Sequence, residues 1–220
     1  MRASSISSSA ELISPVRSTS GPAPSVAADF HPSALADIYQ PEINIAIWQR
    51  SLASDLHSYA EQLVHVAPHW QTRFIERPAL VSDQLANTLP LPNGRQALID
   101  DVVLLVDMFS CLFELEHVGV RMAVLRKAMC PKFHVDRIPC RLLCTYAGPG
   151  TFWHSSEQVD YLGNNTVSPK AGAMQKQLSL GDVALLKGEY WEGNEGHGLV
   201  HRSPLASDVS PRLVLTLDFS

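Results

Sequence analysis

The sequence predicts an α+β protein in which N-terminal helices pack on a β-sandwich or barrel. Apolar residues recur at helical spacing through the first half of the chain, and short alternating runs of strand type fill the second half. Helices followed by a cluster of strands are typical of this class. We expect a helical layer over residues 39–116 and a β-rich metal-binding domain over residues 117–220.

Residues 1–38 precede these two parts and are rich in Ser, Pro and Ala but poor in aromatic residues. Such a segment cannot bury enough apolar surface to offset the entropy lost on ordering it. The sequence therefore predicts a disordered tail. Its serines together with Arg2 and Arg17 also imitate an organellar transit peptide, which is the less economical interpretation.

Three helices are expected in the first half. The first spans residues 42–66, where large apolar side chains recur every three or four positions. These side chains are Trp48, Leu52, Leu56, Tyr59 and Leu63. A second helix is expected within residues 68–77, and a third over residues 95–115 with its apolar stripe running from Leu98 to Leu112. We interpret these stripes as core packing.

After Glu116 the apolar period shortens to two residues, which indicates strands. Strands are expected in "HVGVRMAVL" (117–125), "IPCRLLCTY" (138–146), "GDVALLKG" (181–188), "GLVH" (198–201) and "RLVLTLDF" (212–219). In the last strand the leucines face one way and Arg212, Thr216 and Asp218 face the other.

Bulk composition excludes two classes of protein. The net charge of −5 and the acidic pI argue against a nucleic-acid binder, whose footprint would be a basic face. The most apolar run, "ALIDDVVLLVDMF", is interrupted by Asp100, Asp101 and Asp107, so a membrane span is not expected.

The chain contains four cysteines, at positions 111, 130, 140 and 144. They could form two disulfides in a secreted protein, but no apolar signal-peptide core follows the first residues. We expect reduced thiols in a cytoplasmic protein.

His134 and Asp136 stand two positions apart just before a predicted strand, so their side chains point to the same face. An imidazole and a carboxylate aimed into an interior are costly unless something pairs with them. A structural hydrogen-bonded pair is one explanation, and a metal ion is another. His201 supplies a third ligand of the right type, and two histidines with one carboxylate form the facial triad that binds Fe(II).

Two alternatives for the metal site remain open. His197 competes with His201, although a histidine beside a glycine is typical of an ordinary loop. Cys130 and His134, together with Cys140 and Cys144, could instead form a thiolate zinc site. Against this, Cys140 and Cys144 share a strand face with apolar residues, which indicates core positions.

The order His134, Asp136, His201, then Arg212 on the following strand resembles the Fe(II)/2-oxoglutarate-dependent dioxygenase superfamily, as does "LSLGDVALLKG" ahead of His201. The resemblance implies a double-stranded β-helix, a jelly-roll or cupin-like fold. It further implies Fe(II) as cofactor, with zinc possible instead, and 2-oxoglutarate as cosubstrate. Arg212 would anchor the far carboxylate of 2-oxoglutarate, assisted by Thr145 or Tyr146.

"CPKFHVDRIPCRLLCTYAGPGT" and "WEGNEGHGLVHRSP" more closely resemble a bacterial domain family of unknown function, from about residue 40 to the end of the chain. Members of that family are often encoded beside zinc-homeostasis GTPases. This resemblance implies a cytoplasmic location and a link to metal supply, and it brings no established activity.

The sequence thus leads to two hypotheses: an Fe(II)/2-oxoglutarate-dependent oxygenase, or a non-catalytic metal-binding protein of metal homeostasis. The substrate, whether small molecule or protein, is not encoded in any recognisable motif. Residues 152–178 read as a polar loop that could cover a site, with His154 at its rim.

Overall fold

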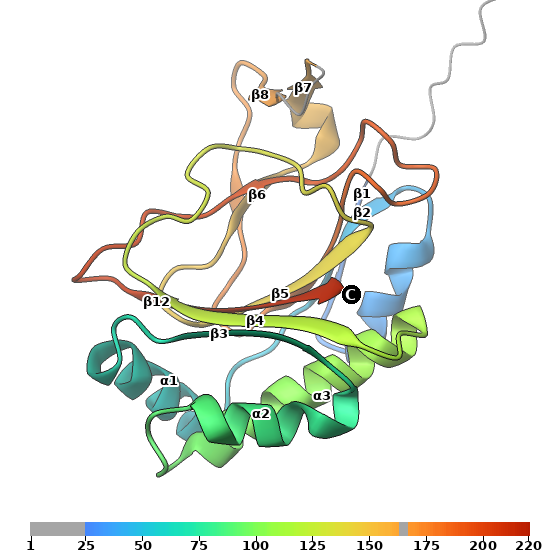
Figure 1. Cartoon of the computed structure of the whole chain (residues 1–220). Coiled ribbons are helices and arrows are strands. Elements are labelled where there is room, and N and C mark those ends of the chain that lie inside the picture. The colour runs from blue at the N-terminus through green and yellow to red at the C-terminus, as the bar shows by residue number, and fades with distance from the viewer. Residues whose placement is uncertain (1–24, 163–166) are drawn as a thin grey trace, which may run out of the picture.

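The computed structural model describes residues 25–162 and 167–220 as a mixed α/β protein (Figure 1). Its helices are η1 (Pro32–Tyr39), α1 (Ser54–Val66), η2 (Pro78–Leu80), α2 (Val81–Thr88), α3 (Arg95–Phe113) and η3 (Ser156–Gln158). Its strands are β1 (Ser25–Asp29), β2 (Ile43–Trp48), β3 (Gln71–Glu76), β4 (Val118–Leu125), β5 (Cys140–Ala147), β6 (Phe152–His154), β7 (Val159–Tyr161), β8 (Val167–Pro169), β9 (Lys176–Gln177), β10 (Val183–Lys187), β11 (Val200–Arg202) and β12 (Arg212–Phe219).

A seven-stranded sheet in the order β1-β2-β10-β5-β12-β4-β3 forms the body of the protein. Strand β12, next to the central strand β5, pairs antiparallel with β5 on one side and with β4 on the other. A small sheet in the order β11-β6-β9 and a β7–β8 hairpin lie outside this large sheet. The last strand of the chain therefore runs through the middle of the molecule.

The helices α1, α2 and α3 cover one face of the large sheet (Figure 1). The expected apolar stripe of α3, including Leu98, Val102 and Phe109, packs into the core on this side. Leu213 and Leu217 of β12 point into the same core, which confirms the predicted alternation of that strand. Arg212 and Thr216 consequently face away from the helices.

The opposite face of the large sheet is covered by the small sheet and the segments around it. Trp153 of β6, with Leu178 and Leu199, packs there against residues of the large sheet such as Leu143 and Val214. Two sheets thus enclose a second core, and the polar residues of β5 and β12 that point to this side are enclosed with it.

Two of the helix predictions are wrong in part. Ile43–Trp48 is strand β2, and only Ser54–Val66 of the first expected helix is helical. Ala46 of β2 packs into the core under the helices, and Ile45 and Ile47 pack into the second core, so both faces of the strand are buried and it lacks the two-residue alternation of a half-exposed strand. Its residues therefore continued the helical pattern of α1 by coincidence. The second expected helix is strand β3, whose exposed and partly buried residues alternate along an edge of the sheet.

Part of the predicted tail is also ordered. Residues 1–24 lie outside the described residues, but Ser25–Asp29 forms β1, which pairs parallel with β2. The indole of Trp48 donates to the carbonyl oxygen of Phe30, and Leu35 and Ile38 of η1 are buried. Backbone pairing and a few apolar anchors stabilise this segment, although its composition is that of a linker.

The segment 152–178 is not a continuous loop, because it contains β6, η3, β7, β8 and β9 among its described residues. None of the helices in the described part of the chain is both long enough and apolar enough to cross a bilayer.

Candidate metal centre

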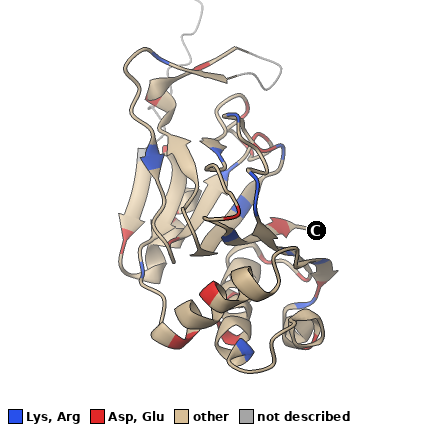
Figure 2. Cartoon of the chain, turned by 90° about the vertical axis from the view of Figure 1, so that its left-hand side faces the viewer, with Lys and Arg blue, Asp and Glu red and all other residues tan. Residues whose placement is uncertain are grey.

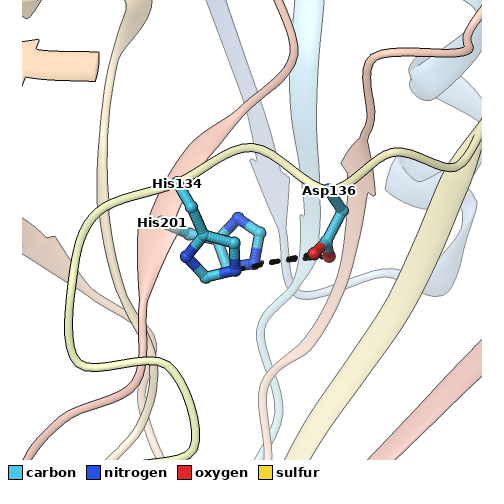
Figure 3. Close-up of side chains that lie close together, drawn as sticks. All are labelled: His134, Asp136 and His201. Atoms are coloured by element: carbon cyan, nitrogen blue, oxygen red, sulfur yellow. Dashed lines mark ion pairs between the residues drawn. The ribbon is translucent and has the colours of Figure 1, made fainter. Parts of the chain in front are cut away.

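Among the described residues, one group of side chains is arranged to bind a metal ion: His134, Asp136 and His201. Their ligand atoms all lie within 4.8 Å of one another. The Nε2 atoms of His134 and His201 lie 3.5 and 3.4 Å from the two carboxylate oxygens of Asp136. Figure 3 shows the two imidazoles side by side, both directed at that carboxylate. The structure thus brings together the three side chains that the sequence singled out as ligands.

Backbone pairing places the two histidines beside each other. His201 belongs to β11, and His134 pairs with it in an isolated antiparallel bridge. The amide nitrogen of each residue lies 3.0 Å from the carbonyl oxygen of the other. Because Asp136 follows His134 by two residues in an extended segment, its side chain returns to the same face.

The hydrogen bonds of the two rings determine which nitrogen can bind a metal. Nδ1 of His134 lies 3.0 Å from the carbonyl oxygen of Lys132, and Nδ1 of His201 lies 3.1 Å from that of Leu199. A carbonyl oxygen only accepts, so Nδ1 carries the proton in both rings. The lone pair of each neutral ring is therefore on Nε2, which faces Asp136. This is the orientation that outer hydrogen bonds give to metal-binding histidines.

Asp136 is held by an arginine that the sequence analysis did not single out. Nη1 of Arg141 donates to Oδ2 of Asp136 at 2.6 Å, while its Nε and Nη2 donate to the two oxygens of Asp218 at 2.8 and 2.9 Å. Burial raises the pKa of Asp136, but in the metal-free protein the hydrogen bonds that His134 and His201 donate when their rings are protonated, together with the charge of Arg141, outweigh it and hold that pKa well below its usual range. The carboxylate is consequently ionised, as a metal ligand must be.

Arg212 is buried close to this group of ligands. It is 1% exposed, and it lines a small cavity together with His134, His201 and Arg141. Its Nη2 donates to the hydroxyls of Thr145 and Thr151 at 3.3 and 3.2 Å, and its Nε has no partner among the described residues. Burial without a carboxylate nearby lowers the pKa of Arg212 to about 10. A buried guanidinium with unused donors is costly, so this position is suited to an anion.

Of the two hydroxyl residues predicted to assist Arg212, only Thr145 lies beside it. Tyr146 is the next residue of β5 and so points to the opposite face, where its hydroxyl donates to Asp101 at 2.6 Å. The prediction of Tyr146 as a cosubstrate ligand is therefore wrong. The second hydroxyl beside Arg212 is that of Thr151. The loop between β5 and β6 brings Thr151 to this position, and apart from its glycines nothing in the sequence of that loop predicts the contact.

The competing ligands lie elsewhere. His197 is exposed, with its ring 5.7 Å from that of Tyr161, and is not part of the metal-binding group. His154 is not at a rim but buried, with its ring 4.5 Å from that of Phe133.

All four cysteines are free thiols, as expected. Cys140 and Cys144 are buried in the core under the helices, on the far side of the sheet from His134. Burial raises the pKa of Cys144 to about 12, so its thiol stays protonated at neutral pH. The geometry does not support the thiolate zinc site.

The chain matches the family model described as "Protein of unknown function (DUF1826)" over residues 29–218, and it therefore belongs to that family. No curated protein matches it in sequence.

Solved structures show similarity in fold at low identity. A candidate oxygenase from Shewanella oneidensis is 9% identical, with a TM-score of 0.51 over 90% of this chain and 89% of that one. A prolyl-4-hydroxylase from Pseudomonas putida is 10% identical, with a TM-score of 0.44 over 85% and 96% of the two chains. A collagen prolyl hydroxylase of Paramecium bursaria Chlorella virus-1, solved in complex with 2-oxoglutarate, is 11% identical, with a TM-score of 0.40 over 80% and 96%.

Proposed function

We propose that this member of the DUF1826 family is an Fe(II)- and 2-oxoglutarate-dependent oxygenase. The observation that carries the proposal is the combination of a His-Asp-His group with a buried arginine whose Nε lacks a partner among the described residues. The first needs a cation and the second needs an anion, and both border one cavity. Fe(II) with a dicarboxylate cosubstrate meets both needs.

The donor set fits the metal. Two neutral Nε2 atoms and one carboxylate oxygen are the ligands of the facial triad, which leaves coordination positions open for other molecules. When bound, Fe(II) would supply the oxygen chemistry, driven by oxidative decarboxylation of 2-oxoglutarate. His134, Asp136 and His201 would hold the ion, and Arg141 would keep the carboxylate of Asp136 in place and ionised.

The residues around Arg212 fit the cosubstrate. The guanidinium would form a charge-assisted pair with the carboxylate of 2-oxoglutarate that lies away from the metal. The hydroxyls of Thr145 and Thr151, which now accept from Arg212, can turn to donate to the same carboxylate. Because Arg212 is buried, bulk water does not compete for this pair, so it is stronger than a pair at the surface.

We further propose that the two sheets form a double-stranded β-helix. Strands β10, β5, β12 and β4 are neighbours in the large sheet, and β11 and β6 face them across the second core. The ligands then come from the small sheet and the segment paired with it, while Arg212 comes from the large sheet. The fold similarity to the Shewanella oneidensis structure, which is named as an oxygenase, supports the proposed function.

The test is to load the purified protein with Fe(II) without oxygen, measure the metal content, and follow succinate formation from 2-oxoglutarate after oxygen is admitted. We expect one equivalent of metal and slow turnover even without substrate. His201→Ala should abolish both, whereas His197→Ala removes a histidine four residues away and should change neither.

One specific outcome would favour the alternative function. A protein that binds one equivalent of metal but shows no binding of 2-oxoglutarate at millimolar concentration would be a metal-binding protein and not an oxygenase. Such a result would contradict the role of Arg212 while leaving the metal ligands in place.

A further inference from the structure

Two arginines lie directly opposite each other at the edge of the large sheet, near the metal centre. Arg73 of β3 pairs in register with Arg121 of β4, and Arg121 pairs in turn with Thr216 of β12. Directly opposite residues point to the same face, with Cβ atoms about 5 Å apart. Thr216 borders the metal-centre cavity, so both guanidinium groups are on the side of the sheet that carries the metal ligands.

These two arginines lack counter-charges. Neither Arg73 nor Arg121 has an ion pair or a side-chain hydrogen bond with any residue in the ranges 25–162 and 167–220. The nearby carboxylate, Asp218, is already engaged by two nitrogens of Arg141. Like charges placed directly opposite each other on a sheet are destabilising. In a chain of net charge −5, with basic and acidic residues both spread along the ribbon (Figure 2), this local excess of cations stands out.

The space for a ligand is already present. A cavity of about 140 Å³ is bordered by Arg73, Arg121, Arg141 and Asp218. Gly119 forms part of its wall in the interior of β4, where a Cβ atom would lie 3.3 Å from the carbonyl oxygen of Asp218.

This cavity adjoins the metal centre. Arg141 borders both this cavity and the one beside His134 and His201, and it donates to the ligand Asp136. Arg141 is thus the wall that the two cavities share, and a molecule whose anionic end is held by Arg73 and Arg121 would lie next to the metal centre. The position suits a substrate and is separate from that of Arg212.

We propose that Arg73 and Arg121 form a recognition site for an anionic group of the substrate, a carboxylate or a phosphate. That the bound anion belongs to a substrate rests on the proposed oxygenase function. The anion site itself does not depend on that function. Guanidinium groups bind both anions through paired, charge-assisted hydrogen bonds. Two of them on neighbouring strands can share the oxygens of one anion, which also relieves their mutual repulsion.

The test uses the full chain without metal or 2-oxoglutarate. Anion binding is then measured independently of the oxygenase reaction, so a negative result for one proposal does not decide the other. Inorganic phosphate and acetate are titrated separately at constant ionic strength with chloride as the balancing anion, and the arginine side-chain signals are followed by NMR. We expect saturable binding of at least one anion, weakened about tenfold or more in Arg73→Gln/Arg121→Gln. The anion that binds with the higher affinity indicates whether the substrate carries a phosphate or a carboxylate.

Matched variants locate the site. Arg77→Gln removes an exposed arginine four residues from Arg73 and should leave binding unchanged. Without added anion, Arg121→Gln should unfold at the same temperature as wild type or higher, because a like-charge pair is removed. Absence of saturable binding of either anion, or equal binding by wild type and the double variant, would overturn the proposal.

Discussion

An arginine lies on each side of the large sheet, the partly buried Arg50 on the helix side and the buried Arg212 on the other, and the two have opposite surroundings. On the helix side, Arg50 forms two hydrogen bonds with Asp101, at 2.6 and 2.8 Å, and a third with the carbonyl oxygen of Gly181. On the other side, the side-chain hydrogen bonds of Arg212 with described residues go to two hydroxyls, those of Thr145 and Thr151. Burial lowers the pKa of both groups, but at Arg50 the bonds with Asp101 outweigh burial and raise it, whereas the pKa of Arg212 falls to about 10.

This difference separates a polar group that is fully paired within the protein from one that keeps an unpaired donor among the described residues, and the proposed role of Arg212 rests on that donor. Asp101 also accepts from Tyr146, so the group around Arg50 is complete within the chain. The group around Arg212 is not, because no acidic residue in the described ranges contacts it. Two adjacent residues of β5 belong to different groups: Tyr146 faces Asp101 in the group around Arg50, and Thr145 faces Arg212.

The largest effect is expected from breaking the complete pair. Asp101→Ala leaves Arg50 and Tyr146 without their shared acceptor in a largely buried position, and should lower the free energy of unfolding by about 3 kcal/mol. Denaturant unfolding measures this loss. Metal content per folded molecule should remain that of wild type, and a variant that loses its metal would contradict the separation of the two faces.

Asp136→Ala should have the converse effect. It removes the carboxylate of the His-Asp-His group, so metal affinity should fall by more than about 100-fold. This loss exceeds the one that follows from changing a residue that only hydrogen-bonds to a metal ligand. The metal-free protein should lose less stability than Asp101→Ala does, because Arg141 keeps both hydrogen bonds with Asp218. Competition with a chelator of known affinity gives the first quantity and denaturant unfolding the second.

Arg212→Met tests the unpaired arginine directly. Without its charge, 2-oxoglutarate binding should weaken by about 2 kcal/mol, the scale of a hydrogen bond to a charged group. The metal-free protein should be as stable as wild type or more so, because an apolar side chain replaces a buried charge without a carboxylate partner. Calorimetric titration of the metal-loaded proteins and thermal unfolding decide the two points. A strongly destabilised variant would mean that Arg212 has a structural role like that of Arg50.

The smallest effect is expected for the buried thiols. Replacing Cys140 and Cys144 together with Ala should cost about 1 kcal/mol per site, since each change removes one buried, methyl-sized atom from the helix-side core. Metal content should be unchanged. Loss of one equivalent of metal in this double variant would restore the thiolate zinc site.

Patterns of local residues were sufficient to predict several elements and the three side chains that the structure brings together as a possible metal site. Period-two alternation identified β4, β5 and β12, and the stripe from Leu98 to Leu112 identified α3. The residue types and order of His134, Asp136 and His201 indicated a facial triad, because ligand chemistry depends on side-chain type. The leucines of β12 placed Arg212 on the face of the sheet away from the helices.

Other features were decided only by contacts between distant parts of the chain. Ile43–Trp48 is a strand because β1 and β10 pair with it, and because cores on both faces of the sheet bury its side chains, the alternation by which a strand is recognised is lost. Asp101 was predicted only to interrupt an apolar run, yet it is the counter-charge of Arg50, 51 residues away. Arg73 and Arg121 face each other only through the register of β3 and β4. The sequence by itself determined the chemistry of the ligands and the faces of its alternating strands. The tertiary structure alone decided which charges find a partner, because pairing depends on distances between strands and helices that no local pattern encodes.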